Sequence, residues 1–112
     1  MIEETIIKYL GEKLAPVPVL AEYPDGKTIP CVFIEKTGSG ENNGIRSATV
    51  ALQSLADSLY NAAVLNEQVK EAAADMIELD EICRVSLNSD YNFTDIQTKQ
   101  YRYQAVYDIT YY

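Results

Sequence analysis

The sequence predicts an α+β fold, with a single mixed or antiparallel sheet of about four to five strands flanked by two helices. Apolar residues recur at helical spacing over residues 2 to 14 and 55 to 78. Residues 100 to 112 alternate at period two without proline or glycine, which is typical of a strand. A chain of 112 residues is expected to form one domain, residues 1 to 112.

The first helix is expected over residues 2 to 14. Its first turn contains Glu3 and Glu4, where the helix dipole favours acidic side chains. Pro16 then disfavours helical geometry at the residue before it, so the helix should end just ahead of this proline.

Two strands are expected next. Residues 17 to 23 contain two prolines, which confine this segment to a sheet edge or to the start of a strand. Residues 24 to 27, Pro-Asp-Gly-Lys, predict a turn. Residues 29 to 36 are apolar on both faces, so the second strand is predicted to lie inside the sheet.

Residues 37 to 44 contain three glycines and two asparagines and are predicted to form a flexible loop. A phosphate-binding loop is excluded here, because Gly44 is followed by Ile45 and Arg46 instead of Lys and Ser or Thr. Residues 45 to 53 alternate again and predict a third strand. Its face toward the core is expected to carry Ala48, Val50 and Leu52.

The principal helix is expected over residues 55 to 78, with an alanine-rich stripe that allows close packing on a sheet. Ser54 and Asp57 are predicted to cap its start. Its second half is acidic, and a solvated face is the interpretation we favour over a binding site. The acids concerned are Glu67, Glu71, Asp75, Glu78, Asp80 and Glu81.

A fourth strand is predicted over residues 82 to 87, followed by a polar loop over residues 88 to 99. The inward residues of this strand are expected to be Cys83, Val85 and Leu87. The loop is not a calcium site, because Asp95 occupies the glycine position of that motif and Tyr101 occupies the position of its glutamate.

Composition excludes several classes of function. A formal charge of −8 disfavours binding to a phosphate backbone, so no specific nucleic-acid binding is expected. Without a long apolar run, no membrane span is expected, and acids near the N-terminus argue against a signal peptide. Cys31 and Cys83 are interpreted as buried thiols in preference to a disulfide.

The sequence contains no histidine, which removes the commonest general base and an important metal ligand. Its two cysteines form no CxxC pair, and no pair of carboxylates lies in an apolar setting. We therefore expect no enzymatic activity, no catalytic or metal-binding residues and no cofactor.

Five segments resemble a family of small phage proteins. They are Ile34–Gly38, Ala48–Ser54, Ala62–Glu67, Leu87–Asp95 and Tyr101–Tyr107. Together they are similar to the tail terminators of phages and prophages of Gram-positive bacteria, which are also called minor capsid or tail-completion proteins. The resemblance extends over nearly the whole of residues 1 to 112 and carries no catalytic signature.

The resemblance implies a hexameric ring that caps the tail tube and meets the head connector. The expected partners are therefore other copies of the chain, the tail-tube protein and a head-completion or connector protein, with DNA passing through the lumen. The expected location is the virion tail, and the host cytoplasm during assembly. Two alternatives are another small head–tail joining protein and a cytoplasmic adaptor domain without catalytic activity.

Five residues are candidates for the assembled state. Tyr111 and Tyr112 are predicted at a subunit interface, because tyrosine combines a large apolar ring with a polar tip. Glu41, Asp90 and Asp95 are predicted to face the lumen from loops that become ordered on assembly, where they would repel DNA.

Overall fold

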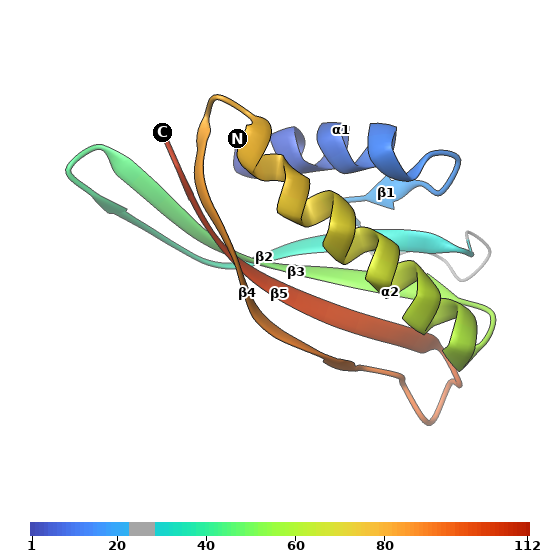
Figure 1. Cartoon of the computed structure of the whole chain (residues 1–112). Coiled ribbons are helices and arrows are strands. Elements are labelled where there is room, and N and C mark those ends of the chain that lie inside the picture. Colours follow the sequence, from blue (N-terminus) through green and yellow to red (C-terminus); the bar gives the residue numbers. More distant parts are fainter. Residues whose placement is uncertain (23–28) are drawn as a thin grey trace.

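Two helices lie on one face of an open mixed sheet in the computed structural model, which describes residues 1–22 and 29–112 (Figure 1). The predicted α+β class is confirmed. Within the described residues the elements are α1 (Ile2–Leu14), β1 (Val19–Leu20), β2 (Cys31–Asn42), β3 (Ile45–Ala56), α2 (Leu59–Ala74), the 3-10 helix η1 (Asp75–Glu78), β4 (Ile82–Asn92) and β5 (Tyr101–Tyr111).

The tyrosine-rich strand β5 lies inside the sheet, whose order is β1-β2-β3-β5-β4. It is antiparallel to both of its neighbours, and Tyr107 is opposite Val50 of β3 and Leu87 of β4. The backbone groups of β5 therefore find partners on both sides, as a buried strand requires. The prediction that residues 100 to 112 form a strand is confirmed.

The strand predicted over residues 17 to 23 is much shorter in the structure. β1 comprises only Val19 and Leu20, which pair in parallel with Val32 and Phe33 of β2. Its position at the edge of the sheet agrees with the constraint set by the prolines. Residue 23 of the predicted strand and the whole predicted turn, residues 24 to 27, lie outside the described residues.

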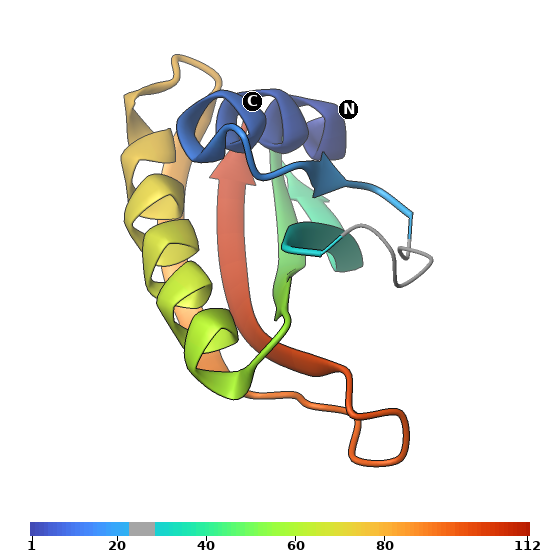
Figure 2. The same ribbon diagram turned by 90° about the vertical axis from the view of Figure 1, so that its right-hand side faces the viewer.

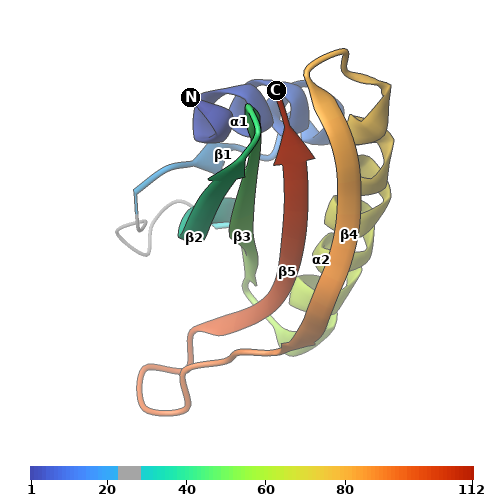
Figure 3. The same cartoon turned by 90° about the vertical axis from the view of Figure 1, so that its left-hand side faces the viewer.

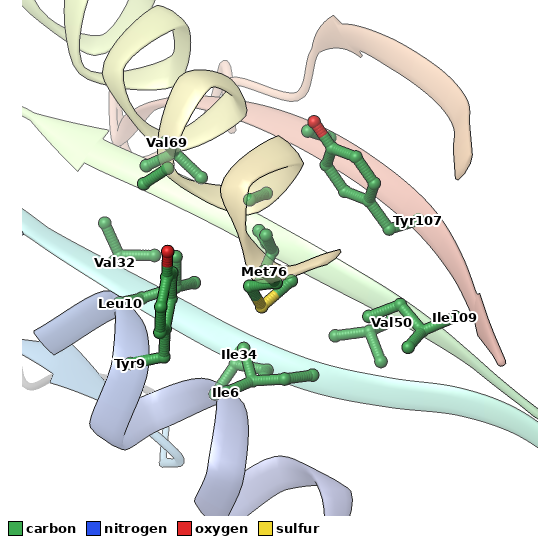
Figure 4. Packing of buried hydrophobic residues seen from close by; sticks show 14 of the residues in the cluster. Ile6, Tyr9, Leu10, Val32, Ile34, Val50, Val69, Met76, Tyr107 and Ile109 are labelled. Atoms are coloured by element: carbon green, nitrogen blue, oxygen red, sulfur yellow. The ribbon is translucent and has the colours of Figure 1, made fainter. Parts of the chain in front are cut away.

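The core forms between the sheet and both helices (Figure 4). Ile6 and Leu10 of α1 meet Val69 of α2 and Met76 of η1 above the inner face of the sheet. The sheet contributes residues at period two, as its alternation predicts. They are Val32, Ile34, Ala48, Val50, Leu52, Ala105, Tyr107 and Ile109.

The start of α2 differs from the prediction. Residues 55 and 56 belong to β3, and Ser54 is buried in that strand, so Ser54 does not cap the helix. Ser58 does, because its Oγ accepts a hydrogen bond from the backbone N–H of Asn61 at 3.1 Å. Pairing of Leu55 with strands on both sides outweighs its local helical preference.

The predicted flexible loop at residues 37 to 44 is wrong. β2 continues to Asn42 and β3 begins at Ile45, so only Asn43 and Gly44 form the turn. Both have positive φ, 54° and 81°, as in the tight turn that Asn-Gly favours between antiparallel strands. The resulting hairpin projects beyond both helices (Figure 1).

Replacing Gly44 with alanine tests this turn. An added Cβ meets no atom within 4 Å, so the expected loss in free energy of unfolding, about 1 kcal/mol, comes from the backbone conformation alone. Gly11→Ala is the control, because it also adds a Cβ in open space but lies within α1, where alanine favours the helix. Urea denaturation should show opposite shifts, and equal shifts would contradict the turn geometry.

The boundary of β4 also differs from the prediction. The strand extends to Asn92 and so includes residues 88 to 92 of the segment predicted as a loop. Two register shifts, after Ile82 and after Leu87, interrupt its alternation. Leu87, predicted to be inward, is 47% exposed, because β4 is the last strand of the sheet. Cys83 is half-buried, whereas Cys31 is buried, and both are free thiols.

Candidate functional site

The described residues contain no group of three or more Asp, Glu, Cys or His side chains that could hold a metal ion. Burial raises the pKa of the Cys31 thiol, so the reactive thiolate form is less populated at neutral pH. No helix in residues 1–22 and 29–112 is long and apolar enough to cross a membrane. The surfaces and edges of the sheet are the remaining candidates for a functional site.

The outer face of the sheet, opposite the helices, is visible in Figure 3. A row of polar side chains crosses it from β3 to β4. Gln53 donates to Gln104 at 3.0 Å, and Gln104 donates to the Tyr91 hydroxyl. Arg102 adds a bond to Gln53 at 3.3 Å. Both glutamines are buried, so this row ties three strands together and makes the outer face rigid.

A second polar contact lies further along the same face. Asp108 accepts hydrogen bonds from Thr49 of β3 and Asn88 of β4, both at 2.9 Å. Because Asp108 belongs to the strand between them, its carboxylate bridges three neighbouring strands. The row and this bridge therefore both link β3, β5 and β4 on the face that no helix covers.

Two strand edges remain open. β1 pairs with β2 only at Val32 and Phe33, so residues 34 to 42 of β2 have no strand on that side within the described part of the chain. β4 pairs with β5 alone, so its other edge is also open across residues 82 to 92, again among the described residues. Open edges offer backbone donors and acceptors to another chain.

Asp90, one of the predicted lumen residues, lies on the helix side of β4. Its Oδ1 accepts a hydrogen bond from Asn66 at 2.7 Å, and its Oδ2 is 2.6 Å from Lys70 Nζ. Lys70 also contacts Glu67 at 2.9 Å. The hydrogen bond to Asp90, with that to Glu67, raises the pKa of Lys70, so this cation remains charged. Asp90 thus joins β4 to α2.

The other two predicted lumen residues lie at opposite ends of the sheet. Glu41 is opposite Arg46, beside the end of β5, whereas Asp95 precedes the start of β5. The Asp95 carboxylate accepts backbone hydrogen bonds from Gln97 and Thr98, and the bond from Thr98 is the main reason that its pKa is lowered. The structure does not bring Glu41, Asp90 and Asp95 together.

The predicted interface residues lie at the end of β5 near the N-terminus. The Arg46 guanidinium is 5.3 Å from the centroid of the half-buried Tyr111 ring and also donates to the Tyr112 carbonyl at 2.9 Å. The side chain of Tyr112 is 64% exposed. With Glu81 and the start of α1 they line a shallow cavity of about 190 Å³. Tyr112 therefore remains available to a partner.

The opposite end of the sheet carries exposed apolar side chains that the sequence analysis did not single out. Phe93 is partly exposed under the Arg102 guanidinium, 4.9 Å from its ring centroid, and Ile96 is 86% exposed in the turn before β5. The sequence offered a signal for Ile96, because it is an isolated aliphatic residue within a polar segment.

The chain was compared with models of known protein families and with curated protein sequences, and it matches none of them.

Proposed function

We propose that this chain is a structural virion protein that forms a closed ring, like the tail terminators that it resembles in sequence. The ring would cap the tail tube on one side and meet the head connector on the other. The observation that carries this proposal is the pair of open strand edges on opposite sides of the sheet.

The directions of the strands support repeated association. β2 is antiparallel to β3, β3 to β5, and β5 to β4, so the two strands with open edges run in opposite directions. When two copies stand side by side in the same orientation, β4 of one and β2 of the next are therefore antiparallel, the slightly more stable pairing. Two different surfaces meet, so the same contact repeats and forms a ring when the rotation closes.

The proposal includes six subunits, with self-association, the tail-tube protein and the connector as partners, in the virion tail and in the host cytoplasm during assembly. It requires no catalytic residue and no cofactor. With a charge of −8 on each subunit, the ring would repel DNA in its lumen instead of binding it. A head–tail joining protein of another kind would use the same open edges.

Light scattering and negative-stain microscopy over a range of concentrations test the proposal. A closed oligomer is expected, and tail-tube protein should promote it. Leu87→Lys places a charge on the open edge of β4 and should raise the concentration needed for assembly about tenfold or more. Leu59→Lys is the matched control, because Leu59 is similarly exposed but lies on α2.

A monomer at every concentration, with and without tail-tube protein, would contradict the ring and favour the adaptor domain. A wild-type oligomer that Leu59→Lys and Leu87→Lys weaken equally would show that the edge of β4 is not the contact. Assembly of both variants at the wild-type concentration would lead to the same conclusion.

A further inference from the structure

Register shifts divide the open edges of β2 and β4 into short stretches. In β2 a shift just before Gly38 separates residues 34 to 36 from residues 38 to 42. In β4 two shifts enclose residues 84 to 87. A β-bulge bends its strand and interrupts the ladder, so a neighbouring strand follows only the stretch between two shifts without a break. A contact between these two edges therefore falls within one stretch of each.

Residues 38 to 42 are the accessible stretch of the β2 edge. Before the shift, β1 occupies this edge at Val32 and Phe33, beneath α1 (Figure 2). Lys36 is also held against α1, because its Nζ lies 3.7 Å from Glu3 Oε2. Residues 38 to 42 instead lie in the hairpin that projects beyond both helices (Figure 1). A neighbouring strand can therefore approach them without meeting either helix of the same copy.

The open stretch of β4 lies at the same level of the sheet. Gly38 is paired with Thr49 of β3, which is paired with Asp108 of β5. Asp108 is in turn paired with Ser86 of β4. The next two rows of paired residues join β2 to β4 in the same way, and their ends are Ser39 with Val85 and Gly40 with Arg84. Directly opposed residues share a face, so both ends of each row lie on the same side of the sheet.

The last part of β4 has no free counterpart on β2. Tyr91 and Asn92 are level with Phe33 and Val32, through rows of the same kind. Both of those β2 residues pair with β1. In a copy at the same height, β1 would therefore stand between its own β2 and this end of the neighbouring β4.

We infer that residues 38 to 40 of one copy pair with residues 84 to 86 of the next, with Gly38 opposite Ser86. This inference rests on the proposed ring and specifies the register of its contact. Rotation about a single axis leaves all copies at one height. Strands that run along that axis then meet their neighbours at the level that they occupy in their own sheets. Gly38 adds no side chain where the next copy approaches, and glycine in a strand often marks such a close approach of another backbone.

Disulfide formation between two cysteine variants tests this register. Gly38→Cys and Ser86→Cys are prepared in a Cys83→Ser background, which leaves only the buried native thiol of Cys31. A Cβ added at Gly38 meets Thr49 at 3.8 Å, an ordinary contact, so the fold should tolerate it. At a concentration at which the wild type assembles, mild oxidation of an equimolar mixture should link the two variants, whereas neither variant alone should form a linked dimer.

Ser89→Cys is the matched control, because Ser89 has the same side chain as Ser86 and lies on the same face of β4. Ser89 is paired with Val106, two positions along β5 from Asp108, so it lies about 7 Å further along the sheet. Its Cα would then be beyond the roughly 7 Å limit for a disulfide with residue 38. Gly38→Cys should therefore give about tenfold more linked dimer with Ser86→Cys than with Ser89→Cys.

A charge test at Leu87 gives a second measurement that needs no cysteine. Leu87 is level with Lys36 through Tyr107 and Val50. In this register Leu87→Glu meets an opposite charge and Leu87→Lys meets a like charge. Leu87→Glu should therefore assemble at a concentration about threefold or more below that of Leu87→Lys. Equal concentrations, or the reverse order, would overturn the register.

Linkage of Gly38→Cys to Ser89→Cys as readily as to Ser86→Cys would overturn this inference and leave the proposed ring intact. Linkage to neither variant, when both unfold thermally as the wild type does and the wild type assembles, would lead to the same conclusion. A wild-type protein that never assembles would overturn the ring itself, and this inference with it.

Discussion

Val50→Asp is expected to lower the free energy of unfolding by about 4 kcal/mol or more, because it places an unpaired carboxylate in the core. Val50 is fully buried on the inner face of β3 and packs in the cluster that joins the sheet to both helices. The residue opposite it on β5, Tyr107, is also buried, so the carboxylate would have no direct access to solvent. Urea denaturation followed by circular dichroism measures the change.

Ser47→Asp is the control for this variant. Ser47 belongs to the same strand but is exposed, so the same aspartate should change the free energy of unfolding by less than about 1 kcal/mol. If Val50→Asp unfolded at the wild-type urea concentration, the inner face of β3 would be assigned incorrectly.

Leu10→Ala is expected to lower the free energy of unfolding by about 3 kcal/mol, within the range for a buried leucine truncated to alanine. Leu10 has no exposed surface and packs with the core beneath α1. Alanine retains a high helix propensity, so the loss reports packing and the cavity left behind, not the stability of the isolated helix.

Thermal or urea unfolding of Leu10→Ala should be compared with that of Lys8→Ala, an exposed position in the same helix. The control should lie within about 0.5 kcal/mol of wild type. Equal effects of the two variants would mean that α1 contributes little to the core.

Strong periodicity explains which elements the sequence predicted correctly. α1 coincides with the predicted residues 2 to 14, and β5 lies within the predicted residues 100 to 112. In both segments the apolar spacing is uninterrupted and local preference agrees with the tertiary environment. The α+β class followed from these two segments, the third strand and the longer helix.

Tertiary pairing explains the errors. Residues 37 to 42 contain glycine and serine, yet they form a strand because β3 provides partners along their whole length. The Asn43-Gly44 pair was a turn signal that could have been used, but the composition of the surrounding segment obscured it. Local sequence cannot show how far a neighbouring strand extends.

The candidate site was less predictable than the fold. Asp90 contacts Asn66 and Lys70, 24 and 20 residues away along the chain, and its orientation follows a register shift in β4. Neither fact is encoded in the residues adjacent to Asp90. Tyr112 could be singled out from composition alone, and its exposure is consistent with a contact.

The central position of β5 has a consequence for the order of folding. β3 and β4 each pair with β5 and not with each other, so β4 has no strand partner until residues 101 to 111 have been synthesised. A folding intermediate in which β5 has not yet joined the sheet therefore leaves β4 without a strand partner, and the pairing of β3 with β5 spans a long sequence separation. Such contacts slow folding and expose intermediates to aggregation. The incorporation of β5 is consequently the step that removes the unpaired strand edges on which such an intermediate could aggregate.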